Sequence, residues 1–326
     1  MRPLKLITPP RSRQHGAALL TAMIIVTLIA TLAASMVWQQ WRAVQVEAAE
    51  RARTQSSWIL SGALDWARLI LREDQRDDLR KGKVTDLTEP WAVPLAEARL
   101  STFLAADKDN NTDDGGVEAF LSGSISDAQG RYNLNNLIDQ NKVVPSEVEA
   151  LRALCSTLGI DSGVPDRIAK GLLDANAGAS ANAPLLPKMV SQLTWFGVDP
   201  ASVAALEPFV VLLPSGNAVP VNINTAPREV LSAVIKGNDV ATSERILQVR
   251  QRTPFRSLDD FKKQFPSLDT TNAKLDVGSD WFEVRGRLRL ADRILEERSL
   301  IQRLPAAPFS KIWERQRVSS RESTGS

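Results

Sequence analysis

The sequence predicts an α+β protein: a long N-terminal helix packed on a small antiparallel sheet, with a large all-α domain inserted between the strands. Three observations predict this fold. An apolar run at residues 17–37 continues into an amphipathic segment that ends near residue 73. Segments with the alternation typical of strands lie near residues 117–137 and 280–304. Between them, residues 145–265 have a helical pattern.

The N-terminal segment has the pattern of a membrane anchor. Residues 1–16 contain no Asp or Glu, and their basic residues are Arg2, Lys5, Arg11 and Arg13. Residues 17–37 carry no charge, and about 20 apolar residues are enough to span the hydrocarbon core. Because Lys and Arg flank the cytoplasmic side of a first span, we expect residues 1–16 in the cytoplasm and everything after Trp38 outside the inner membrane.

Three interpretations of this anchor are open. A secretory signal peptide has about 7–15 apolar residues and then a small-residue cleavage site, but Trp38-Gln39-Gln40-Trp41-Arg42 follows the run here. An uncut signal anchor is the second interpretation. The third is cleavage between Gly16 and Ala17, ahead of the apolar run, which would make Ala17 the mature N-terminus.

Composition excludes several classes of chemistry. Removal of residues 1–16 takes away four of the 40 basic residues, so 36 basic residues face 38 acidic ones, without the basic surplus typical of nucleic-acid binding. The one histidine is His15 and the one cysteine is Cys155. A mature chain without histidine has no Ser-His-Asp or Cys-His catalysis and no ordinary zinc site, so we do not expect an enzyme. We expect Cys155 to pack as a small buried hydrophobic residue.

The amphipathic extension at residues 38–73 predicts a continuation of the N-terminal helix. From Val37 to Arg72 there is a single glycine, Gly62, and no proline, and apolar residues recur near the helical period. Two separate helices are the alternative. Residues 74–115 are polar and loop-like, and Trp91–Leu95 is expected to be an ordered insert.

The patterns of residues 74–326 predict how this part of the chain divides into domains. Residues 74–133 and 280–304 would form an α/β domain, residues 134–279 the inserted helical domain, and residues 305–326 a flexible tail. The inserted domain contains a weak repeat of helix, glycine turn and helix, at residues 148–175 and 228–250.

The repeat also carries helix-start signals. Pro165 and Pro227 are expected in first helical turns, where proline is tolerated. Thr225 is expected to be a helix N-cap.

Residues 221–261, which include Asn222-Ile223-Asn224-Thr225-Ala226, resemble a helix-hairpin-helix unit. Such units bind phosphate through the free amides of a Gly-x-Gly turn at a helix N-terminus. Here the turn is Lys236-Gly237-Asn238-Asp239, which lacks the second glycine and places a carboxylate where an anion would lie. We therefore expect no nucleic acid, and a membrane-anchored DNA receptor is the alternative function.

An acidic tract at residues 107–114 spaces oxygen ligands two residues apart. A calcium ion takes six to eight oxygens, so one interpretation is a calcium site at Asp107, Asp109, Asn111, Asp113 and Asp114. The tract departs from an EF-hand loop because Thr112 stands at the glycine position and no Glu follows at the expected place. A solvated acidic loop is the favoured interpretation.

The order of basic leader, Gly16 and apolar helix resembles the leader of type IV pilins and type II secretion pseudopilins, which a prepilin peptidase cuts. Such subunits usually carry Glu five residues after the scissile glycine, where this chain has Thr21. A carboxylate in the bilayer is costly and needs a partner. Loss of this Glu in the resembling family marks the K-type minor subunit.

Together with Asp127-Ala128-Gln129-Gly130-Arg131-Tyr132-Asn133-Leu134-Asn135 and residues 222–226, these features resemble the GspK family of minor pseudopilins, over residues 11–304. The resemblance implies a pilin-like fold and a place at the pseudopilus tip, in the inner membrane and periplasm. It implies minor pseudopilins of the I and J types, the inner-membrane assembly platform and prepilin peptidase as partners. Calcium occurs in the family, which slightly favours the calcium interpretation.

Overall fold

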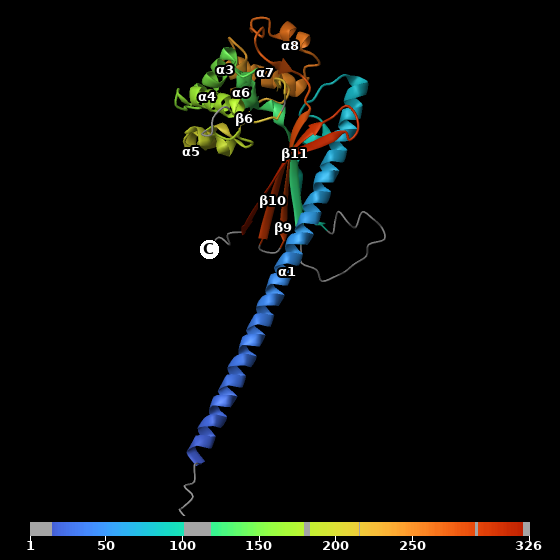
Figure 1. The fold of residues 1–326 in the computed structure, drawn as a ribbon. Helices are drawn as coiled ribbons and strands as arrows, with labels where there is room; N and C mark the ends of the chain where they lie inside the picture. Colours follow the sequence, from blue (N-terminus) through green and yellow to red (C-terminus); the bar gives the residue numbers. More distant parts are fainter. Residues whose placement is uncertain (1–14, 101–118, 179–182, 215, 291–292, 322–326) are drawn as a thin grey trace, which may run out of the picture. The chain divides into compact units, whose positions relative to one another are not determined.

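The computed structural model describes residues 15–100, 119–178, 183–214, 216–290 and 293–321 (Figure 1). The chain divides into two compact units, Met1–Trp58 and Ile59–Ser326. The predicted calcium ligands Asp107, Asp109, Asn111, Asp113 and Asp114 lie outside the described residues.

One helix, α1 (His15–Lys81), contains both the apolar run and its amphipathic extension. It is long and apolar enough to cross a membrane, and no other helix among the described residues is. The helix ends at Lys81 rather than near residue 73, because residues 74–81 contain no glycine or proline to interrupt it. Gly82 follows with φ +100°, a backbone conformation that stops a helix.

The second unit contains a five-stranded antiparallel sheet in the order β1-β2-β9-β10-β11. The strands are β1 (Leu95–Arg99), β2 (Ala119–Asp127), β9 (Trp281–Leu290), β10 (Arg293–Arg303) and β11 (Ser310–Arg321). The predicted strands after residues 117 and 280 are present. The prediction of a flexible tail from residue 305 is wrong for β11, which pairs with β10 from Arg293↔Arg321 to Arg303↔Ser310. A Ser- and Arg-rich composition is not typical of a strand, so the sequence did not predict β11. Pairing with β10 stabilises this strand.

The end of α1 in this unit packs on the sheet through one stripe of buried side chains. Leu60, Leu64, Ala67 and Leu71 are at most 5% exposed and recur at helical spacing. They contact apolar side chains of β2, β9 and β10, together with Trp91 of the short helix η1 (Pro90–Ala92). The expectation of an ordered insert at Trp91 therefore agrees with the structure, since Trp91 is 1% exposed.

The chain between β2 and β9 is rich in helices and has its own apolar core. Its α-helices are α3 (Pro145–Thr157), α4 (Val164–Ala177), α5 (Pro200–Leu206), α6 (Arg228–Val234), α7 (Val240–Arg252) and α8 (Leu258–Gln264). Its 3-10 helices are η2 (Ala128–Gly130), η3 (Leu134–Leu137) and η4 (Val190–Phe196). Short strand pairs join β3 (Tyr132–Asn133) to β6 (Val210–Val211), β4 (Ile138–Asp139) to β5 (Lys142–Val143), and β7 (Val221–Asn222) to β8 (Leu275–Asp276). Cys155 lies in this core, as expected.

The predicted repeat forms two helix–turn–helix units, α3–α4 and α6–α7. Gly159 and Gly237 take positive φ in the two turns, +69° and +78°, where glycine has no steric cost. Pro165 lies in the first turn of α4, as predicted. Pro227 is the N-cap of α6 and precedes its first turn, so the prediction that Pro227 lies in that turn is wrong. The prediction that Thr225 caps this helix is wrong for the same reason. The Thr225 hydroxyl donates to the buried carboxylate of Asp127 (2.6 Å).

Candidate functional site

The start of α1 contains the residues predicted for processing. Gly16 and Ala17 lie in its first turn. The Thr21 hydroxyl donates to the carbonyl oxygens of Ala17 (3.1 Å) and Ala18 (2.9 Å), so its polar group is satisfied within its own helix. A threonine at this position therefore needs no partner from another subunit, whereas a carboxylate would. Cleavage between Gly16 and Ala17 stays a prediction.

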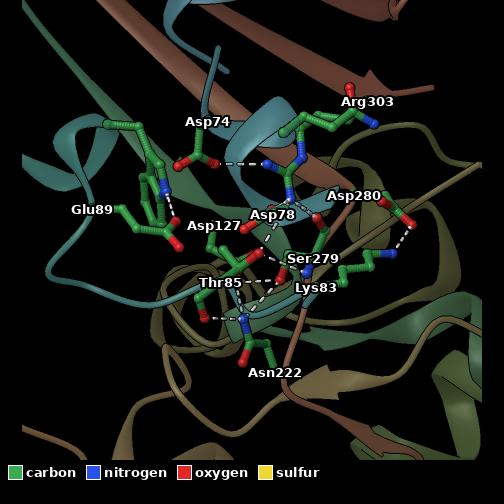
Figure 2. Close-up of polar contacts among 12 residues, drawn as sticks. Asp74, Asp78, Lys83, Thr85, Glu89, Asp127, Asn222, Ser279, Asp280 and Arg303 are labelled. Atoms are coloured by element: carbon green, nitrogen blue, oxygen red, sulfur yellow. Dashed lines mark hydrogen bonds and ion pairs between the residues drawn. The ribbon is translucent and has the colours of Figure 1, made fainter. Parts of the chain in front are cut away.

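A second candidate site is a buried polar cluster in the second unit, shown in Figure 2. We call it the polar cluster; its members are Asp74, Asp78, Thr85, Glu89, Asp127, Asn222, Ser279 and Arg303. They come from the end of α1, the loop after it, the end of β2, the helical region and the end of β10. The cluster therefore joins segments that are far apart in the sequence.

The polar cluster has two halves, one around the carboxylate of Asp127 and one around the guanidinium of Arg303. In the first half, Asp127 is the central hydrogen-bond acceptor. Its carboxylate accepts hydrogen bonds from the Gln129 backbone N–H (2.7 Å), the Asn222 side-chain amide (2.9 Å) and the hydroxyls of Thr225 and Ser279 (2.6 Å each). Burial raises the pKa of Asp127, and these hydrogen bonds oppose the rise. The carboxylate thereby connects the end of β2 to the residues just before α6 and just before β9.

The Asn222 side chain extends this half. Its amide also donates to the Thr85 carbonyl oxygen (3.0 Å) and to the Ser279 hydroxyl (2.9 Å). Two motifs that carried the family resemblance, at residues 127–135 and 222–226, are thus brought together by direct hydrogen bonds. The sequence singled out both motifs but gave no indication that they touch.

Arg303 is the cation of the other half, with a side chain only 1% exposed. Its guanidinium pairs with Asp74 (2.7 Å) and Asp78 (3.1 Å), one helical turn apart on α1. It also donates to the Thr85 hydroxyl (3.2 Å) and to the Ser279 carbonyl, and it lies 4.8 Å from the Phe282 ring centroid. Sequence reasoning missed Arg303, because nothing local distinguishes it from the other arginines of the C-terminal strands.

Asp74, Asp78 and Glu89 bring three carboxylate oxygens within 4.8 Å of one another, so they are the described residues that could hold a metal. Arg303 already engages Asp74 and Asp78, and the Trp91 indole N–H donates to Glu89. A calcium ion would need six to eight oxygen ligands. Three carboxylates that already bind other groups do not fit a calcium ion. The guanidinium of Arg303 supplies the positive charge that Asp74 and Asp78 need.

Glu89 should make stability depend on pH. Burial raises its pKa to about 8 from 4.5, helped by the charges of Asp74 and Asp78. Between about pH 4.5 and 8 the folded chain then binds more protons at Glu89 than the unfolded chain, so stability falls as pH rises through this window. We expect Glu89→Gln to flatten the fall, because a neutral amide still accepts from Trp91.

Thermal unfolding of the detergent-solubilised chain at pH 5, 6.5 and 8.5 checks this prediction. Asp78, whose pKa burial raises to about 6, acts in the same direction and remains in the variant. The exposed Glu149 on α3 gives a matched control as Glu149→Gln. Parallel melting profiles for Glu89→Gln and the unsubstituted chain would contradict the assignment.

The helix turns that resembled a DNA-binding hairpin use their carboxylates locally. Asp239 is the N-cap of α7 and accepts from the Thr242 N–H (2.6 Å). Asp161 accepts from the Gly163 N–H (3.0 Å). Each carboxylate accepts from a backbone amide near a helix start, the kind of group with which a helix N-terminus binds phosphate.

Comparisons with known proteins agree on one family. Two family models, each described as "Type II secretion system (T2SS), protein K", match residues 221–284 and 130–215. Type II secretion system protein K of Pseudomonas aeruginosa is 33% identical over 308 residues, covering 87% of each chain. The Pectobacterium carotovorum protein of that name is 27% identical over 325 residues, covering 89% of this chain and 93% of the relative.

A solved structure shares the fold. It is the crystal structure of the GspK-GspI-GspJ complex from the type 2 secretion system of enterotoxigenic Escherichia coli. The match has a TM-score of 0.61 and 21% sequence identity, and it covers 83% of this chain and 99% of that chain. The predicted α+β, pilin-like fold is thereby confirmed.

A long N-terminal helix with an apolar start, an antiparallel sheet that packs on its end and a helical insertion between the strands give the chain a pilin-like fold. Together with the family models and the sequence relatives, this fold defines a minor pseudopilin. The chain belongs to the type II secretion system protein K family. It is a component of the machinery for protein transport.

Proposed function

We propose that the chain stands at the tip of the type II secretion pseudopilus and starts its assembly with minor pseudopilins of the I and J types. The single observation that carries this proposal is the fold shared with the K subunit solved in a GspK-GspI-GspJ complex. Through the pseudopilus, the chain would support export of folded proteins across the outer membrane.

The residues of this chain support an end position. Thr21 is satisfied by its own helix and offers no carboxylate to the amino terminus of a neighbour. A helical region as large as the one between β2 and β9 suits the end of a filament better than its interior. The chain would be anchored in the inner membrane by residues 17–37, with residues 1–16 cytoplasmic and the C-terminal region periplasmic.

The role we infer is structural and not catalytic. His15, the one histidine, would leave with the leader. Cys155 is buried, and burial raises the pKa of its thiol to about 11, which disfavours the reactive thiolate. Its partners would be the I- and J-type subunits, the assembly platform and prepilin peptidase.

Processing provides the first test. The N-terminal residue of the membrane-extracted chain is expected to be Ala17, N-methylated, when prepilin peptidase is present, and Met1 when it is absent. Gly16→Ala should leave residues 1–16 attached and abolish export, because the peptidase cuts after this glycine. Mass spectrometry of the intact chain and assay of exported proteins measure both.

A matched variant separates processing from anchoring. Ala18→Gly alters a small residue of the same helical turn without touching the predicted scissile bond, and it should be processed normally. Normal processing and export in Gly16→Ala would refute a pilin-type leader. Association is tested by purifying the full chain with full-length I- and J-type subunits; a chain that stays alone would refute the proposed place in assembly.

A further inference from the structure

The helix α1 changes character directly after its apolar run. Residues 17–37 carry no charge and are exposed throughout their own unit. At the rise of an α-helix they extend over about 31 Å, which matches the thickness of about 30 Å of a hydrocarbon core. When Ala17 lies at one boundary of that core, Trp38 therefore lies at the other.

Three side chains share one face of α1 at this second boundary. Trp41 and Arg42 follow Trp38 at i+3 and i+4, the spacing that places helix side chains on the same side. The rings of Trp38 and Trp41 are in contact, with centroids 5.6 Å apart, and the two residues are 63% and 56% exposed. Gln39 and Gln40 lie on the opposite side of the helix. We call Trp38, Trp41 and Arg42 the interface patch.

Arg42 carries a charge that its own helix does not neutralise. No acidic residue lies within four positions of it on either side, and it forms no ion pair with any residue that the structure describes. The arginines farther along α1 differ, since Arg51 pairs with Glu47 (2.5 Å) and Arg53 with Glu50 (3.5 Å). The guanidinium of Arg42 is thus available to an anion outside the chain.

The chemistry of the interface patch fits a lipid headgroup. Tryptophan is enriched where the bilayer core meets water, because its indole has an apolar body and a polar N–H. A guanidinium at the same depth lies among lipid phosphates, to which it can donate two parallel hydrogen bonds. An apolar helix packed on this face would instead bury the charge of Arg42 without a counter-charge, which is costly. The position beside the apolar run and the unpaired charge therefore both favour lipid over a partner helix.

We propose that the interface patch binds phospholipid headgroups of the periplasmic leaflet and thereby fixes the depth of α1 in the membrane. This inference rests on the proposed function, because it requires that residues 17–37 anchor the chain. It also places the predicted cleavage site at the opposite membrane surface, since Gly16 and Ala17 stand at the other end of the run.

Quenching of tryptophan fluorescence by brominated lipids is the first experiment, with the full chain in vesicles of phosphatidylcholine and about one quarter phosphatidylglycerol. Bromine atoms near the headgroup should quench at least about twofold more fluorescence than bromine atoms at the bilayer centre. The double variant Trp38→Phe/Trp41→Phe should lose most of this quenching. The matched control is Trp58→Phe/Trp66→Phe, which removes two exposed rings of the same helix outside the proposed span and should keep it.

Charge reversal is the second experiment. Arg42→Glu should lower the quenching by headgroup-region bromines by about half, because lipid phosphates repel a carboxylate and the rings move outward. The loss should be smaller in vesicles of phosphatidylcholine alone, whose headgroups carry no net charge. The matched control is Arg53→Glu on the same helix, with a side chain 77% exposed, which should be quenched like the unsubstituted chain. Circular dichroism of both variants verifies that the helix is intact.

The outcomes are separable. Quenching that is strongest from the bilayer centre, or that persists in Trp38→Phe/Trp41→Phe, would overturn the inference and leave the proposed function standing. Equal behaviour of Arg42→Glu and Arg53→Glu would overturn it as well. Loss of quenching when full-length I- and J-type subunits share the vesicles would make a partner helix the occupant and contradict the inference. A chain that does not float with the vesicles would overturn the proposed anchor and this inference with it.

Discussion

Replacing Arg303 by Met should lower the free energy of unfolding by about 3–5 kcal/mol, because it leaves buried carboxylates without their cation. The guanidinium pairs with Asp74 at 2.7 Å and Asp78 at 3.1 Å, and the side chain is 1% exposed. Methionine replaces the bulk of the side chain but none of its donors. Burial already raises the pKa of Asp74 and Asp78, so the variant should shift both pKa values further upward.

Chemical denaturation of the full chain in detergent measures this effect. The control is Arg298→Met on the same strand, whose side chain is 44% exposed and pairs with Glu207 at the surface. Such surface pairs contribute about 0–1 kcal/mol, so the control should change little. Arg303→Lys should be intermediate, since it keeps the charge but cannot bridge two carboxylates with a planar fork. A loss below about 1 kcal/mol for Arg303→Met would show that the polar cluster does not stabilise the fold.

The predicted elements that the structure contains have strong local patterns. The apolar run, the absence of proline from α1 and the alternation of β9 each specify one element from neighbouring residues. The sequence of β11 has no such local pattern. The strand is stabilised by distant groups: it pairs with β10, and Glu297 binds Arg315 and Arg317. The division of the chain into domains at the predicted boundaries remains a prediction.

The polar cluster could not be predicted for a different reason. Asp74, Asp127, Asn222 and Arg303 belong to separate elements, and only the tertiary fold brings them together. Thr225 illustrates the limit. Its position before a helix is typical of an N-cap, but α6 begins at Arg228 with Pro227 as its N-cap, so Thr225 lies two residues too early. The Thr225 hydroxyl donates to the buried carboxylate of Asp127. A local pattern therefore indicated that a helix follows, but not the residue at which it begins.

The hydrogen bonds of Asp127 should hold the helical region to the sheet, so removing them should destabilise the fold. Asp127→Ala should cost about 3 kcal/mol, because the Gln129 N–H and the side chains of Asn222, Thr225 and Ser279 lose a buried acceptor. Asp127→Asn should cost about 1 kcal/mol, since its carbonyl still accepts and both hydroxyls can turn to accept from its amide.

The comparison of the two variants separates lost hydrogen bonds from lost charge. Asn222 retains acceptors at the Thr85 carbonyl and the Ser279 hydroxyl, so the Asn variant leaves no donor of that side chain without a partner. In Asp127→Ala, hydrogen exchange should accelerate first at residues 221–228, where the helical region meets Asp127. Equal losses in the two variants would mean that the buried charge, and not the hydrogen-bond geometry, fixes this junction.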